Sequence, residues 1–224
     1  KDPDTRLYAR GPRYRLDAEM IRDQALAVSG LLHQKIGGPS VKPPQPDGLW
    51  HAVAYTDSNT ARFVQDEGKD KVHRRSLYTF WKRTAPPPQM AIMDAPSREV
   101  CTIRRERTNT PLQALMLMND PQFLEAARAL AERILKEGGP TIQEQLAFGF
   151  ELATARLPDE REISILQSTL ENHLSQFQSD PESAQQLIKI GESMANESIE
   201  TTKLAAWTMI ANLILNLDEV LTKG

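Results

Sequence analysis

The sequence has very little cysteine: Cys101 is the single one among 224 residues. This excludes an internal disulfide, a metal site built from several cysteines and the Cys-x-x-Cys-His motif that attaches c-type haem. The four histidines show no metal-ligand spacing such as His-Glu-x-x-His. We therefore expect this segment to bind no metal, haem or other cofactor.

Long apolar runs and a secretory signal pattern are also missing, which predicts no membrane-spanning segment in these residues. The common catalytic patterns do not occur either: there is no P-loop, no dinucleotide-binding glycine pattern and no Gly-x-Ser-x-Gly elbow. The sequence thus contains no catalytic motif, and it leaves open whether the protein is an enzyme.

The net charge is small, at -3, which argues against nucleic acid or a membrane surface as a bulk partner. The charges are nevertheless unevenly distributed. Residues 69–107 hold ten basic and four acidic side chains, whereas residues 108–224 hold eight basic and seventeen acidic ones. We expect the basic segment to dock on the acidic C-terminal half of the same chain.

Helix-start signals are frequent in the second half of the chain and predict a helical bundle over residues 108–224. Thr110 precedes Pro111 and Asp120 precedes Pro121, so in each pair an N-cap side chain stands before a proline at the first helical position. Further helices are predicted to begin near residues 141, 158 and 180, and an apolar last helix is predicted from about residue 200 to about 217.

Glycine and proline shape the first half. A helical pattern begins at Leu16 and is expected to end at Gly37-Gly38-Pro39. Residues 37–107 then contain two proline clusters, which disfavour helix. The β-branched and aromatic residues at 75–82 predict a short strand. The predicted fold class is mainly α: a helical bundle with an irregular, Pro-rich middle segment carrying at most a short β element.

One domain is expected over residues 1–224. It has three parts: an extended lead-in and first helix (1–36), an irregular basic segment (37–107) and the bundle (108–224). Because the chain starts abruptly without Met, we expect it to be a C-terminal fragment of a larger protein.

Arginine density is the strongest chemical feature of the sequence. Guanidinium groups pair bidentately with carboxylates, sulfates and phosphates. In the simpler interpretation the arginines pair with Asp94, Glu99, Glu106 and the acidic helices, and the motif at residues 104–107 organises the core. In the other interpretation they bind an anionic ligand while aromatic rings stack on its sugars. The candidate binding residues are Arg74, Arg75, Tyr78, Trp81, Arg83, Arg104, Arg105 and Arg107.

The lone Cys101 also allows two interpretations. It lies three residues before Arg104, and neighbouring guanidinium groups favour the reactive thiolate form of a cysteine. No histidine lies nearby in the sequence, and an isolated cysteine is more often a small buried side chain. The sequence favours the buried interpretation and leaves the reactive one open.

Several motifs occur in the order seen in a known family. They are RLDAEMIRD (15–23), IGGPSV (36–41), RRSLY (74–78), FWKR (80–83), DAP (94–96), RRERTNTPLQAL (104–115), NDPQF (119–123) and LILNLDE (213–219). Over roughly residues 6–222 the chain thus resembles the planctomycete PSD family, a domain of unknown function. The resemblance implies a C-terminal position in a large periplasmic or cell-surface protein with a cytochrome-c-like domain upstream. Haem c would then be bound elsewhere in the parent protein, and the resemblance supplies no catalytic residues.

These observations lead to two functional expectations. The first is a non-enzymatic interaction or docking module whose partner is an upstream domain of the same polypeptide or another cell-surface protein. The second is binding or processing of an anionic polysaccharide, sulfated or rich in uronic acid, through the Arg and aromatic side chains. Neither nucleic acid nor a direct membrane span is expected.

Overall fold

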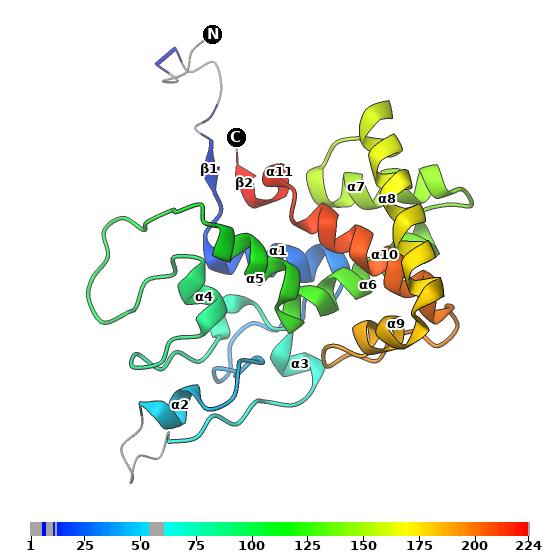
Figure 1. Cartoon of the computed structure of the whole chain (residues 1–224). Coiled ribbons are helices and arrows are strands. Elements are labelled where there is room, and N and C mark those ends of the chain that lie inside the picture. The colour runs from blue at the N-terminus through cyan, green and yellow to red at the C-terminus, as the bar shows by residue number, and fades with distance from the viewer. Residues whose placement is uncertain (1–5, 8–10, 12, 54–60, 224) are drawn as a thin grey trace.

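The computed structural model describes residues 6–7, 11, 13–53 and 61–223, and its fold is mainly α-helical, as the sequence predicts (Figure 1). Residues 1–5, 8–10 and 12 of the expected lead-in lie outside the described residues. The bundle consists of α6 (Pro121–Glu137), α7 (Ile142–Thr154), α8 (Glu160–Ser179), α9 (Pro181–Ile188) and α10 (Thr201–Leu215).

Helix α10 is the centre of this bundle. It packs against α6, α8 and α9, and its side chains Leu204, Trp207, Ile210 and Ile214 are at most 2% exposed. Burial of apolar side chains of this size stabilises the fold by about 1.5–3 kcal/mol each. The apolar stripe predicted for the last helix is therefore the core of the bundle.

The predicted helix starts are confirmed by the capping contacts. Thr110 begins α5 (Pro111–Asn119) and accepts a hydrogen bond from the backbone N–H of Gln113, whose side chain returns a contact to the backbone of Thr110. Such an N-cap contributes about 1 kcal/mol. Thr141 and Asp159 form the same reciprocal cap at α7 and α8, and the side chains of Asp120 and Asp180 accept a hydrogen bond from the first turn of α6 and α9.

The first helix ends earlier than expected. Helix α1 (Ala18–Ser29) stops at Gly30, not at Gly37-Gly38-Pro39. Gly30 adopts a φ of 81°, and its N–H bonds back to the last turn of the helix. Because glycine has no Cβ, it takes this left-handed conformation at little cost and ends the helix there. Helix α1 packs against α6 and so joins the bundle core.

The short strand predicted at residues 75–82 is wrong. Residues Ser76–Tyr78 form the 3-10 helix η1, because contacts from α1 hold this segment in a turn. Asp23 accepts a hydrogen bond from the Ser76 N–H at 2.7 Å. Arg22, which is 4% exposed, donates to the carbonyl of Arg74 at 2.9 Å and to Ser76 Oγ at 3.1 Å. These long-range hydrogen bonds override the local β preference at residues 76–78, and Thr79 makes an isolated parallel bridge to Val41.

The rest of the middle segment is irregular, as predicted. It contains three short helices: α2 (Leu49–Ala52), α3 (Lys69–Val72) and α4 (Pro88–Ile92). Among the described residues the sheet has two strands, β1 (Tyr14–Arg15) and β2 (Thr222–Lys223), which pair antiparallel. The short helix α11 (Asp218–Leu221) precedes β2. The sheet joins the two ends of the described chain beside the bundle (Figure 1).

Candidate functional site: a basic loop and its hollow

A long loop joins α4 to α5 and extends away from the rest of the molecule (Figure 1). Its two ends are held together by Asp94, whose carboxylate accepts hydrogen bonds from the Thr108 N–H at 2.7 Å and the Thr108 hydroxyl at 3.0 Å. Arg15 donates to the same carboxylate at 2.5 Å. A loop of this length with pinned ends is an Ω-loop. We call residues 95–107 the basic loop.

The electrostatics of Asp94 fit this pinning role. Burial acts to raise the pKa of its carboxyl, but the hydrogen bonds from Thr108 and the charge of Arg15 outweigh burial and lower the pKa below its ordinary value. The ionised carboxylate is therefore the form that holds the neck of the loop.

The arginines of the motif line an open hollow of about 810 Å³, together with Asp17 and the neighbouring loop residues. Arg105 donates two hydrogen bonds to Glu19, at 2.6 and 3.2 Å. Arg107 lies over the ring of Tyr14 at 4.3 Å and 3.6 Å from the Asp17 carboxylate. Arg104 is exposed and has no ion-pair or hydrogen-bond partner among the described residues. Hydrogen bonds thus fix Arg105, and the ring of Tyr14 orients Arg107. Arg104 is free of partners among the described residues.

These contacts correct the expected pairing. The sequence predicts pairing of the arginines of residues 104–107 with Asp94, Glu99, Glu106 and the acidic C-terminal helices. Instead, Arg105 pairs with Asp17 and Glu19 at the start of α1, and Arg107 pairs with Asp17. The expectation that they organise the core is also wrong, because the side chains of Arg105 and Arg107 are 33% and 41% exposed. The reason is that α1, and not the acidic bundle, lies beneath the basic loop.

Arg74 is an internal side chain. It is 3% exposed and donates to the carbonyl oxygens of Lys35, Gly37 and Pro39 at 3.1, 2.6 and 2.9 Å. Its guanidinium lies 3.8 Å from the centre of the Tyr78 ring. Arg74 and Tyr78 therefore help to hold the irregular segment in place. The neighbouring Arg75 is mostly exposed and lies 3.5 Å from the Asp23 carboxylate.

Trp81 and Arg83 lie outside the hollow. The Trp81 indole N–H donates to the Ser97 carbonyl at 2.9 Å, and the guanidinium of Arg98 lies 4.5 Å from the ring centre. Arg83 is exposed and pairs with no described residue. The structure thus brings Arg104, Arg105 and Arg107 together in the hollow and places the other five candidate binding residues elsewhere.

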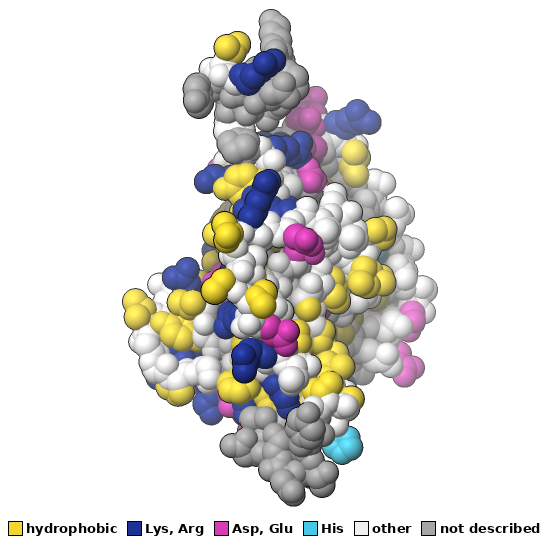
Figure 2. Space-filling view, turned by 90° about the vertical axis from the view of Figure 1, so that its left-hand side faces the viewer, with side chains coloured by type: hydrophobic (Ala, Val, Ile, Leu, Met, Phe, Trp, Pro, Cys, Tyr) yellow, Lys and Arg dark blue, Asp and Glu magenta, His cyan; other side chains and the backbone are white. Residues whose placement is uncertain are grey.

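The sequence reasoning missed an exposed apolar surface beside the basic loop. On α5, the side chains of Leu112, Leu115 and Met118 are 55%, 60% and 47% exposed; we call them the α5 face. In the basic loop, Ile103 is fully exposed and Val100 is 74% exposed. Hydrophobic and basic side chains lie next to one another on this side of the molecule (Figure 2). The signal was available, because α5 is apolar both at its buried positions and at these three.

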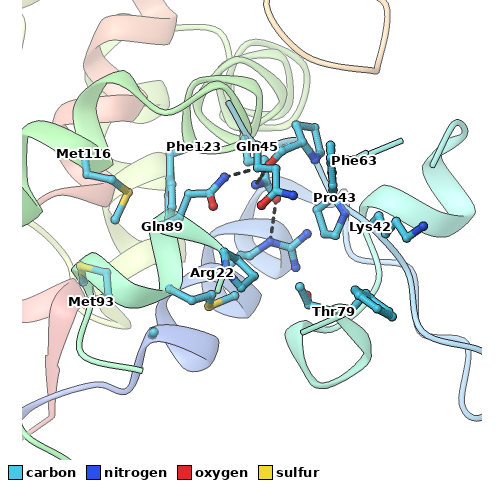
Figure 3. Close-up of a pocket in the computed structure, with 16 residues that line it drawn as sticks. Arg22, Lys42, Pro43, Gln45, Phe63, Thr79, Gln89, Met93, Met116 and Phe123 are labelled. Carbon is cyan, nitrogen blue, oxygen red and sulfur yellow. Dashed lines mark hydrogen bonds between the residues drawn. The ribbon is translucent and has the colours of Figure 1, made fainter. Parts of the chain in front are cut away.

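The Pro-rich segment encloses a second cavity, which is too small for a ligand (Figure 3). Its volume is about 30 Å³, which is the space of about one water molecule. Gln89 and Gln122 both donate to the carbonyl of Pro44, at 2.8 and 3.1 Å, and Arg22 donates to Gln122 at 2.8 Å. These contacts fasten the Pro-rich segment onto α1, α4 and α6, so we assign the cavity a structural role.

A buried polar network joins the middle segment to the bundle. His73 Nε2 lies 3.1 Å from the Glu125 carboxylate, which also accepts hydrogen bonds from the N–H and hydroxyl of Ser193 at 2.7 and 2.5 Å. Arg128 donates to the Ser193 carbonyl and hydroxyl at 2.5 and 2.6 Å. Burial acts to raise the pKa of Glu125, but His73 and Ser193 outweigh burial and lower the pKa to about 2. The network is buried, which suits a structural role.

Three further observations bear on function. Cys101 is exposed in the basic loop, so the buried interpretation of this cysteine is wrong. The described residues contain no group of three or more His, Cys, Asp or Glu side chains that could hold a metal ion. Within the described part of the chain, no helix has the length and apolar character needed to cross a membrane.

Comparison with known proteins identifies a family. The model of the PSD1 family, described as proteins of unknown function (DUF1553), matches residues 1–170. No curated protein and no solved structure matches the chain. The matched range includes the basic loop, its hollow and the α5 face.

Proposed function

The chain belongs to the PSD1 family of proteins of unknown function, and from this premise we propose that it is a non-enzymatic docking module. The observation that carries the proposal is the α5 face together with the exposed Ile103 and Val100 of the basic loop. Exposed apolar side chains grouped on one helix face are typical of surfaces that bind another protein. Methionine and arginine beside them match the composition of protein interfaces.

The partner in this proposal is an upstream domain of the same parent polypeptide or another protein of the cell surface. The parent is proposed to be a planctomycete extracytoplasmic protein with a cytochrome-c-like domain, which would hold its haem outside this chain. This setting rests on the family resemblance of the ordered motifs. The docking surface itself rests on the exposed side chains.

Separate production of this chain and of the remainder of its parent polypeptide gives a direct test. An environment-sensitive dye on the exposed Cys101 should report binding, because this thiol lies in the basic loop. The double variant Leu112→Ser/Leu115→Ser should lose at least tenfold in affinity, which corresponds to about 1.4 kcal/mol.

A matched control is available on the bundle. Leu157 and Ile165 are also exposed, at 65% and 53%, but they lie outside the α5 face. The variant Leu157→Ser/Ile165→Ser should bind like the wild type. Equal binding by the two double variants would refute the assignment of the α5 face.

A second candidate function is supported by the hollow at Arg104, Arg105 and Arg107. The hollow is open to solvent and lined by these three arginines, and guanidinium groups suit sulfate and carboxylate. Calorimetric titration with a sulfated oligosaccharide at low salt is the test, with a neutral oligosaccharide as the control. Binding should weaken as salt is added, and absence of heat at millimolar ligand would refute this candidate.

A further inference from the structure

We infer that the partner docked by this face carries acidic side chains next to apolar ones, and that its carboxylates bind Arg104 and Arg107 in the hollow. This inference rests on the proposed docking function and specifies the chemistry of the partner. The inference is drawn from the hydrogen bonding of the three arginines, because some of their guanidinium groups already have partners within the chain and others do not.

Arg104 and Arg107 retain free hydrogen-bond donors. Arg104 has no partner among the described residues. Arg107 makes no hydrogen bond within the described part of the chain, because the Asp17 carboxylate lies at 3.6 Å; its position over Tyr14, at 4.3 Å, orients the guanidinium plane. Arg105, by contrast, is satisfied by its two hydrogen bonds to Glu19. Two of the three arginines in the hollow can therefore bind an incoming carboxylate.

The basic loop is fixed before any partner binds. The Arg105–Glu19 pair fastens it to α1, and the Asp94–Thr108 hydrogen bonds close its neck. Arg104 and Arg107 flank the fastened Arg105 on either side in the sequence. A surface that is ordered in advance loses less conformational entropy when a partner binds, so these two arginines are well placed for recognition.

The surroundings favour an acidic protein segment over a polyanion. Asp17 and Glu106 also line the hollow, so the local positive field is partly cancelled and a highly charged polysaccharide gains little there. Ile103 is fully exposed and Leu115 is 60% exposed, and a polysaccharide would leave both side chains in water. A protein segment that alternates Asp or Glu with Leu or Phe satisfies the guanidinium groups and covers the apolar side chains together.

Selection from a displayed library of random peptides tests this inference directly. The immobilised wild-type chain should enrich peptides in which Asp or Glu stands next to Leu, Ile or Phe. The variants Arg104→Gln and Arg107→Gln should each bind a synthetic copy of such a peptide about tenfold more weakly. Arg83→Gln is the matched control, since it removes the same charge from an exposed arginine outside the hollow, and it should change the affinity less than twofold.

Two outcomes would overturn the inference. Enriched peptides that lack acidic residues, with binding lost in Leu112→Ser/Leu115→Ser but unchanged in Arg104→Gln, would leave the docking function standing and refute the acidic partner. Arginine-dependent binding of a heparin-derived oligosaccharide, with no peptide enriched, would refute both the acidic partner and the docking function in favour of the glycan. Concentration-dependent sedimentation of the chain alone, lost in Arg104→Gln, would identify the acidic segment as one from a second copy.

Discussion

Arg105 donates two hydrogen bonds to the carboxylate of Glu19, although 86 positions separate the two residues in the chain. This pair fastens the basic loop to the first turn of α1. The hydrogen bond to Glu19 is also the main reason why the pKa of Arg105 is raised. Arg104, its immediate neighbour, is exposed and unpaired among the described residues. Adjacent arginines thus have different roles, one structural and one available to a partner.

Substitution of the two arginines should separate these roles. Arg105→Ala should lower the free energy of unfolding by about 1 kcal/mol, because a bidentate pair at a partly exposed site is lost. Arg104→Ala should leave it unchanged within about 0.5 kcal/mol. Urea unfolding followed by circular dichroism measures both. An equal loss in the two variants would contradict this division.

Arg74→Ala should be among the most destabilising substitutions in the middle segment. The buried guanidinium donates to three carbonyl groups, and hydrogen bonds from a charged donor contribute about 1.5–3 kcal/mol. We expect a loss of about 3 kcal/mol in the same urea experiment. Arg75→Ala removes a largely exposed side chain and should cost less than about 0.5 kcal/mol. A small effect at Arg74 would show that the irregular segment is held by other contacts.

Stability should fall at acid pH through Glu125. Its pKa is lowered from 4.5 to about 2 in the folded chain, so the unfolded state binds protons more readily. The ionised carboxylate therefore stabilises the fold above pH 4.5, and this contribution is lost as the pH falls through about 2. The pH dependence of the free energy of unfolding over this range should be smaller in Glu125→Gln. A profile of unchanged slope would exclude Glu125 as its source.

Gly149→Ala should destabilise the bundle although alanine favours helix. A Cβ at this position of α7 would lie 2.5 Å from Ile134 Cδ1 of α6, and Ile134 is 0% exposed within the core. Overpacking of this kind costs about 1–3 kcal/mol, which exceeds the gain of about 1 kcal/mol in helix propensity. The thermal midpoint should drop, and Ile134→Val should restore part of the loss by removing Cδ1. If Ile134→Val adds to the loss instead, the steric explanation fails.

Cys101 should react in the native protein. It is exposed in the basic loop, so Ellman's reagent should modify one thiol per chain at the same rate in native and in urea-unfolded protein. Arg105→Ala, which releases the loop from α1, should not increase this rate. A native rate at least tenfold lower than the unfolded rate would indicate that the thiol is covered.

Much of the helical half could be predicted from the sequence because the interactions that begin each helix are local. The cap residue Thr110 accepts a hydrogen bond from an N–H only three residues away. A short sequence motif therefore contains both the donor and the acceptor. The end of the first helix is not determined by the local pattern, because Gly30 and Gly37 both satisfy the rule for a helix end, and the observed end is at Gly30. The exposed α5 face was also visible in the sequence as an excess of apolar residues, but which of them are buried depends on how α5 packs.

The sequence alone therefore determined the fold class, the helix starts and the family resemblance, since each depends on neighbouring residues or on their order. The tertiary structure alone decided the pairing of the arginines and the conformation of residues 75–82. Many carboxylates could pair with each guanidinium, and the sequence does not show which carboxylate lies close to which arginine in the folded chain. The placement of α1 beneath the basic loop brings Glu19 to Arg105 and Asp23 to Ser76. That placement results from burial of apolar side chains of α1 against the bundle, which brings together residues far apart in the chain.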